Sequence, residues 1–177
     1  VIINSPHPGT FLRELRDNPA QRDASAYMTF LARPDAERLL AENDYQRLWP
    51  FFAAPPGVRP WLTDEVKAQY RDVWDAGLTG ACNLYRVTPL KPAAPGEAPR
   101  SFPELPRERL TVDVPTLVLW AMDDVALLPG LIEGLDDYVP KLQLKKMPGA
   151  THWIVHEQPE RVMREIEGFA RPAAAAQ

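Results

Sequence analysis

The most regular pattern of apolar and polar residues lies in the last third of the chain. Apolar runs at Val112–Trp120 and Leu142–Met147 predict two buried strands. The amphipathic stretches Leu127–Tyr138 and Gln158–Ala170 predict a helix after each strand. Val1–Ile3, a short β-branched run, fits a further strand of the same sheet. Strands that alternate with helices indicate parallel pairing with right-handed crossovers, and therefore an α/β fold.

Helical spacing of apolar residues dominates the middle of the chain, where we find no strand pattern. Thr63 can cap one of these helices, and Gly77 can end it. The predicted helices cover Ala20–Ala32, Pro34 to about Asn43, Thr63 to Gly77, and Leu78–Val87. A helical insert of this length between two strands predicts a cap over the carboxyl-terminal edge of the sheet, where open α/β folds bind ligands.

Proline marks the segments between these elements. Asn4–Gly9 contains two prolines and predicts a loop, followed by a short amphipathic turn at Phe11–Leu15. Thr88–Pro106 is rich in proline and predicts an extended connector, and the tail Arg171–Gln177 is expected to be frayed. The predicted organisation is a strand and loop of the core at 1–9, a helical cap with its return connector at 10–106, and the C-terminal βαβα part of the core at 107–177.

Composition excludes several classes of function. The 177 residues carry a net charge of −4, which argues against a nucleic-acid partner. No apolar run approaches the roughly 18 residues that a membrane span needs, so we expect no membrane partner. Cys82 is the only cysteine, which excludes an internal disulfide and a cysteine-based metal site. We expect neither a cofactor nor a metal, and a reducing cytoplasm fits this cysteine content best.

An acid and a histidine stand where a catalytic pair is expected. Asp124 follows the first strand of the last third, and His152 follows the next one. The carboxylate can accept a hydrogen bond from the imidazole and orient it as a general base. Asp123 is a rival for the acid, and His156 is a weaker rival for the base. The plain alternatives are a turn aspartate and a surface histidine.

Six short segments of the chain together carry a resemblance to known proteins. They are Asn4–Pro8, Ala26–Leu31, Gly80–Arg86, Trp120–Asp124, and Thr151–Trp153 with Glu157–Pro159. Through them the chain resembles the epoxide hydrolases and their haloacid- and haloalkane-dehalogenating relatives. The resemblance implies the C-terminal part of an α/β-hydrolase fold, with parallel strands alternating with helices and an all-helical cap inserted after the first strand.

The resemblance also implies a reaction on a small-molecule substrate, an epoxide or an organohalide. In epoxide hydrolases two cap tyrosines donate hydrogen bonds to the epoxide oxygen, and Tyr27 and Tyr85 stand at the matching positions. An aspartate nucleophile forms an alkyl-enzyme ester. His152, oriented by Asp124, would then activate water to hydrolyse this ester. The weaker candidates for the substrate pocket are His7, Met28 and Trp153.

The 177 residues contain no strand-to-helix turn that could carry the nucleophile. We therefore expect the C-terminal half of such an enzyme, inactive alone. The incomplete sheet would expose an apolar edge, so we expect the chain to be poorly soluble or paired with the missing N-terminal half. A homo-oligomer is an alternative assembly. Two alternative functions stay open, namely a haloacid or haloalkane dehalogenase of the same fold and a non-catalytic binding module.

Overall fold

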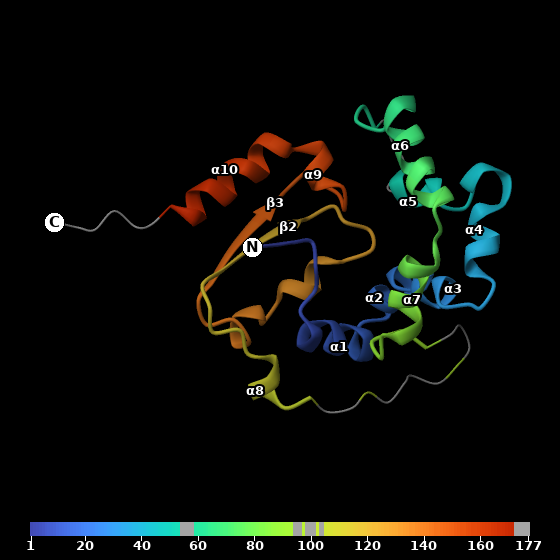
Figure 1. Cartoon of the computed structure of the whole chain (residues 1–177). Coiled ribbons are helices and arrows are strands. Elements are labelled where there is room, and N and C mark those ends of the chain that lie inside the picture. Colours follow the sequence, from blue (N-terminus) through green and yellow to red (C-terminus); the bar gives the residue numbers. More distant parts are fainter. Residues whose placement is uncertain (54–58, 94–96, 98–101, 103–104, 172–177) are drawn as a thin grey trace. The chain divides into compact units, whose positions relative to one another are not determined.

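The computed structural model describes residues 1–53, 59–93, 97, 102 and 105–171 (Figure 1). The chain divides into two compact units, one formed by Val1–Phe11 with Glu104–Gln177 and the other by Leu12–Pro103. Among the described residues, the first unit contains the sheet and the second is built from helices. The predicted connector Thr88–Pro106 lies partly outside the described residues, and the predicted frayed tail lies outside them from residue 172 onward.

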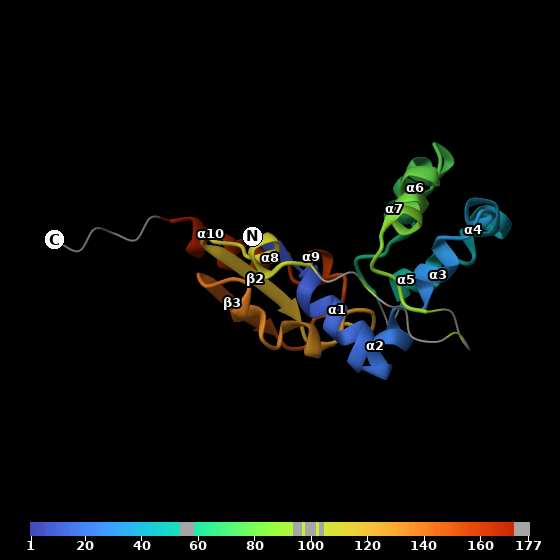
Figure 2. The ribbon, with the colours of Figure 1, turned by 90° about the horizontal axis from the view of Figure 1, so that it is seen from below.

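The sheet has three parallel strands in the order β1, β2, β3. They are β1 (Ile2–Ile3), β2 (Thr116–Ala121) and β3 (Leu142–Met147). Ile3 pairs with Leu119, and Ala121 pairs with Met147. Figure 2 shows β2 and β3 side by side, pointing in the same direction. The predicted α/β fold with parallel strands is therefore confirmed, and the carboxyl ends of the strands meet at one edge.

One face of the sheet is covered by the two last helices, α9 (Ile154–Glu157) and α10 (Pro159–Ala170). Alternate residues of β2 point into this core because side chains alternate between the faces of a strand. The buried residues of this core are Leu117, Leu119, Ala121, Met147, Ala150, Ile154 and Val162. The prediction of a closing helix over Gln158–Ala170 is thus confirmed, apart from its first residue.

The segment between β2 and β3 differs from the prediction. The helix expected over Leu127–Tyr138 is wrong, and two short 3₁₀ helices stand there, η1 (Pro129–Ile132) and η2 (Leu135–Asp137). Pro129 cannot donate a backbone hydrogen bond, and Gly134 has a left-handed φ of 64° that interrupts any longer helix. The apolar spacing reflected burial alone, because Leu131 and Leu135 are buried without a continuous helix.

The segment after β1 also differs from the prediction. A ten-residue helix, α1 (Pro8–Asp17), replaces the short turn and takes in the last two residues of the predicted loop. Pro8 is tolerated because the first residue of a helix needs no backbone donor. The carbonyl of His7 accepts the backbone N–H of Phe11, which begins the helical hydrogen bonding. Phe11 and Leu15, which both lie on this helix, are buried.

The second unit contains short helices. They are α2 (Pro19–Ala24), α3 (Tyr27–Leu31), α4 (Ala36–Tyr45), α5 (Trp49–Ala53), α6 (Asp64–Asp75) and α7 (Thr79–Val87). The single helix predicted over Ala20–Ala32 is wrong, because the chain turns at Ser25, whose buried hydroxyl accepts from the side chain of Gln21. The prediction that Thr63 caps the N-terminus of a helix is confirmed, because its hydroxyl accepts from the Val66 N–H at 3.3 Å.

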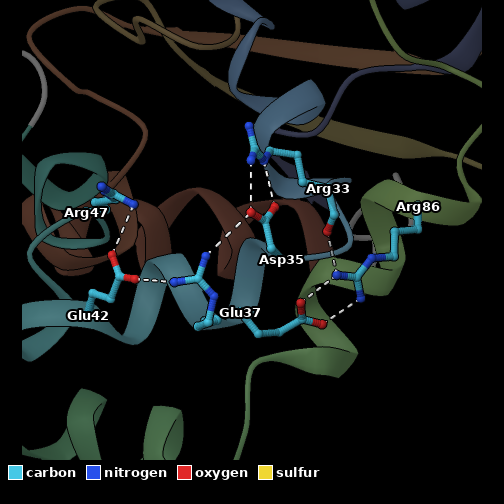
Figure 3. Close-up of polar contacts among 7 residues, drawn as sticks. Arg33, Asp35, Glu37, Glu42, Arg47 and Arg86 are labelled. Carbon is cyan, nitrogen blue, oxygen red and sulfur yellow. Dashed lines mark hydrogen bonds and ion pairs between the residues drawn. The ribbon is translucent and has the colours of Figure 1, made fainter.

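The helices of the second unit share a core to which α3, α4 and α7 all contribute. Its buried residues are Leu31, Ala36, Leu40, Tyr45, Leu78 and Cys82. An ion pair at the end of this core ties α7 to α4: the guanidinium of Arg86 donates to both carboxylate oxygens of Glu37, at 2.6 and 2.5 Å (Figure 3). The same guanidinium donates to the carbonyl of Arg33 at 2.7 Å. This fork geometry fixes the ends of two helices at once.

Gly9 provides a test of the packing around α1. A Cβ at this position would lie 2.6 Å from the ring of Tyr138, which stacks on His7. Gly9→Ala should lower the free energy of unfolding by about 1–3 kcal/mol, as overpacking does. Gly168→Ala in α10 is the control, because no atom lies within 4 Å of its Cβ. This control should gain about 0.5–1 kcal/mol in urea unfolding. Equal stability of the two variants would contradict the close approach of Tyr138.

The Arg86–Glu37 pair provides a second test. Hydrogen bonding from Arg86 lowers the pKa of Glu37 from 4.5 to about 2. Because this pKa is depressed in the folded state, its stabilising contribution is present above pH 4.5 and disappears as the pH falls through 2. The difference in unfolding free energy between the wild type and Arg86→Met should therefore shrink over this range in urea titrations.

Arg38→Met is the matched control for this measurement. Arg38 pairs with Asp35 and Glu42, but its side chain is 65% exposed, so solvent screens the pair. Arg38→Met should therefore change the free energy of unfolding less than Arg86→Met does. A pH-independent effect of Arg86→Met would refute the assigned role of the pair.

Candidate active site

Asp124 lies just beyond the carboxyl end of β2 with a side chain that is 0% exposed. Its Oδ1 accepts from the backbone N–H groups of Ala126 and Leu127, at 2.8 and 3.0 Å. Its Oδ2 lies 2.8 Å from Nδ1 of His152. The neighbouring Asp123 is exposed, so the choice between the two aspartates follows from the burial of Asp124 and its contact with the histidine.

His152 lies in the loop after β3, and 43% of its side chain is exposed. An ionised carboxylate can only accept hydrogen bonds, so Nδ1 of His152 carries a proton and donates a hydrogen bond to Asp124. This fixes the tautomer in which the other ring nitrogen, Nε2, has a free lone pair. The rings of Trp153 and His152 pack edge to face, with their centroids 5.6 Å apart. The arrangement is that of an oriented imidazole that can accept a proton from water.

The loop that carries His152 is held by hydrogen bonds on both sides. The carboxylate of Glu157 accepts from the backbone N–H of Thr151 at 2.8 Å and from its hydroxyl at 2.7 Å. The carbonyl of Ala150 accepts from the backbone N–H of Asp123 at 3.0 Å. These contacts connect the loop to the end of β2 and to α9. The position of the histidine therefore depends on two neighbouring elements.

Asn4, at the end of β1, is a site residue that the sequence reasoning missed. Its amide nitrogen Nδ2 lies 3.1 Å from Oδ2 of Asp124 and 3.4 Å from the carbonyl of Thr151. Its side-chain oxygen accepts from the backbone N–H of Ala121 at 2.7 Å. A signal was available, since a polar residue directly after a strand that neighbours the acid-bearing strand reaches the same edge of the sheet.

Both ring nitrogens of His7, a weaker candidate for the substrate pocket, bind backbone groups. Its Nδ1 accepts from the backbone N–H of Gly9 at 3.1 Å, so Nε2 carries the proton and donates to the carbonyl of Leu110 at 2.7 Å. Its ring stacks on Tyr138 with centroids 4.6 Å apart. A cavity of about 550 Å³ is lined by His7, β1 and the segment before β2, and neither Asp124 nor His152 lines it. His7 thus joins two backbone segments.

Tyr27 and Tyr85 lie together in the second unit, on α3 and α7. Their rings meet edge to face with centroids 5.8 Å apart. Burial raises the pKa of Tyr85, and a hydrogen bond with the side chain of Tyr27 acts in the opposite direction. Met28, beside Tyr27 on α3, is buried. The two predicted cap tyrosines therefore form one hydrogen-bonded pair of phenols in the helical unit.

No helix within the described ranges combines the length and the apolar composition that crossing a bilayer requires. No cluster of three or more His, Cys, Asp or Glu side chains there could hold a metal ion.

Comparison with known proteins shows which proteins the chain resembles. No family model matches the chain. The AB hydrolase superfamily protein YfhM of Bacillus subtilis is 31% identical over 170 residues, which cover 94% of this chain and 54% of YfhM. Epoxide hydrolase 3 of Xenopus tropicalis is 26% identical over 97% of this chain and 45% of its own length. The homologues are epoxide hydrolases and AB hydrolase superfamily proteins.

Solved structures agree with the sequence relatives. The Bacillus megaterium epoxide hydrolase in complex with an inhibitor matches with a TM-score of 0.77 and 25% identity, over 94% of this chain and 58% of that protein. An epoxide hydrolase from metagenomes of hot environments matches with a TM-score of 0.71 and 29% identity. The match covers 97% of this chain and 58% of that protein. The chain has the fold of the C-terminal part of an α/β-hydrolase of this kind. It spans about half the length of the curated relatives it matches.

The tyrosine pair of this α/β-hydrolase fold can be tested by titration. Because the hydrogen bond with Tyr27 lowers the pKa of Tyr85, Tyr27→Phe should raise that pKa further above its ordinary value of 10.0. Ultraviolet difference spectroscopy of phenolate formation measures this shift. Tyr70→Phe is the control, since Tyr70 lies on α6 against Phe52 and Trp74. An unchanged or lower Tyr85 pKa in Tyr27→Phe would show that the two hydroxyls do not interact.

Proposed function

We propose that this chain is the part of an epoxide hydrolase that supplies the base, its orienting acid and the tyrosine proton donors. The reaction converts an epoxide and water into a vicinal diol through an aspartyl-ester intermediate. The observation that carries the proposal is the 2.8 Å contact between His152 and the fully buried carboxylate of Asp124. Its sequence and structural relatives include epoxide hydrolases, which supports the same chemistry.

In the first step, a carboxylate attacks one carbon of the epoxide, and the carbon–oxygen bond on that side breaks. The electron pair of that bond stays on the oxygen, which takes a proton from a tyrosine hydroxyl. The pKa of Tyr85 is raised by burial, so this phenol holds its proton at neutral pH and can act as the donor. We assign the nucleophile to a segment outside these 177 residues, which contain no nucleophile turn.

In the second step, Nε2 of His152 takes a proton from water, and the resulting hydroxide attacks the ester carbonyl. Collapse of the tetrahedral intermediate breaks the ester bond, and the remaining proton of the added hydroxyl passes to the leaving alkoxide, so the diol is released and the carboxylate of the nucleophile is restored. Asp124 stabilises the imidazolium that forms on His152, since its Oδ2 already accepts the Nδ1 proton. The imidazolium proton then returns to the tyrosinate through solvent, so one water is consumed for each epoxide opened.

The tyrosine pair favours an epoxide over an organohalide as the substrate. Opening an epoxide develops negative charge on an oxygen that must be protonated, whereas a departing halide needs no proton. Two phenols joined by a hydrogen bond suit the former requirement. An activity test of the assembled enzyme should therefore compare an epoxide with an organohalide, and we expect turnover of the epoxide.

We propose that the working enzyme pairs this chain with the half of the hydrolase that its relatives also contain. The chain spans 45% and 54% of the two relatives described above. β1 lies at an edge of the three-stranded sheet, with Val1 and Ile2 55% and 36% exposed. Edge strands with exposed apolar residues readily accept a further strand. The proposed partner would supply that strand and the nucleophile.

His152→Ala tests the mechanism in the assembled enzyme, obtained by co-expression with the N-terminal half of a close homologue. Ester formation does not need the histidine, so this variant should react once and retain the alkyl group. Intact-mass spectrometry after mixing with an epoxide should show the added mass, and steady turnover should be lost. His156→Ala is the matched control, since His156 is exposed on α9 and should leave turnover unchanged. Full steady turnover in His152→Ala would remove the histidine from the mechanism.

A further inference from the structure

We propose that Asn4 is the positioning residue of the Asp124–His152 pair, because its amide holds the Asp124 carboxylate in the orientation that faces the histidine. The catalytic consequence of this inference rests on the function proposed above. Its structural content does not, because the orientation of His152 can be measured without any reaction.

Asn4 connects three segments that the site requires. Its backbone N–H donates to the carbonyl of Leu119 at 3.1 Å, which continues the pairing of β1 with β2. Its side-chain oxygen accepts from Ala121, the last residue of β2, at 2.7 Å. Its Nδ2 donates to Asp124 at 3.1 Å and reaches toward the carbonyl of Thr151 at 3.4 Å. One buried side chain, 8% exposed, therefore joins β1, β2 and the loop that carries His152.

Asp124 shows why an amide is needed at this place. Its Oδ1 is held by the backbone N–H groups of Ala126 and Leu127, and its Oδ2 by His152 and Asn4. A buried carboxylate without such donors is costly and rotates or gains a proton. An amide offers donor and acceptor together, so it can serve Asp124 and the Ala121 N–H at once. An amide places the donor and the acceptor on two separate atoms, which a single hydroxyl group cannot do.

The backbone of Asn4 fits the same role. Its φ of 41° lies in the left-handed region, which asparagine tolerates better than most residues. The turn there brings the side chain from the end of β1 to the acid. Glycine tolerates the same backbone conformation, so Asn4→Gly removes the amide without imposing a new strain at this position.

Nitrogen-15 NMR of the imidazole groups in the 177-residue chain tests the proposal. In the wild type, neutral His152 should carry its proton on Nδ1 and show a low-field proton resonance from the bond to Asp124. In Asn4→Gly this resonance should disappear, and both tautomers should be populated, as in free imidazole. Retention of the Nδ1–H resonance and the single tautomer in a folded Asn4→Gly chain would overturn the proposal.

Thr116→Val separates this effect from a general loss of stability. The Thr116 hydroxyl donates to the carbonyl of Val114 at 3.0 Å, at the other end of β2. Its removal deletes a partly buried hydrogen bond in the same unit and should leave the His152 spectrum unchanged. A similar loss of the His152 resonance in Thr116→Val would show that any destabilisation disturbs the pair, and would overturn a specific role for Asn4.

A measurement on the wild-type side chain covers the case in which Asn4→Gly does not fold. The side-chain N–H₂ protons of Asn4 should exchange slowly with solvent, and Asp124→Asn should shift one of them. Fast exchange with no response to Asp124→Asn would overturn the proposal. Neither measurement uses turnover, so an assembled enzyme without epoxide activity would contradict the proposed function and leave the assignment of Asn4 intact.

Discussion

The need to surround one buried carboxylate with hydrogen-bond donors governs the unit that contains the sheet. Asp124 has no exposed side-chain surface, and a buried charge is costly unless it is paired and hydrogen-bonded. Its donors come from its own turn, from Asn4 at the end of β1, and from His152 after β3. Parallel pairing brings the carboxyl ends of the three strands to one edge, so the strand order and the site are parts of one arrangement.

In the helical unit, two partly buried phenols lie side by side. Burial raises the pKa of Tyr85, and Tyr27 provides a second hydroxyl beside it. The position of α7 relative to α4 is fixed one residue further on, where Arg86 binds Glu37 and the carbonyl of Arg33. In the proposed mechanism the base lies in the sheet unit and the proton donors lie in the helical unit, so each group has its own environment.

Local patterns in the sequence were sufficient wherever neighbouring residues decide the outcome. The buried strands β2 and β3, the closing helix α10 and the Thr63 cap all depend on contacts or periodicity within a few residues. The same patterns were misleading between β2 and β3, because apolar spacing reports burial and does not distinguish a helix from two short 3₁₀ turns. They also hid the break at Ser25, where one side-chain hydrogen bond decides the course of the chain.

By itself, the sequence determined that an acid and a histidine follow successive strands and that two tyrosines lie in a helical insert. Only the tertiary structure decided that Asp124, and not Asp123, faces His152, and that both ring nitrogens of His7 bind backbone groups. It also revealed Asn4, which binds a residue 120 positions away. Such contacts have no local period, because strand pairing and burial create them only after the chain has folded.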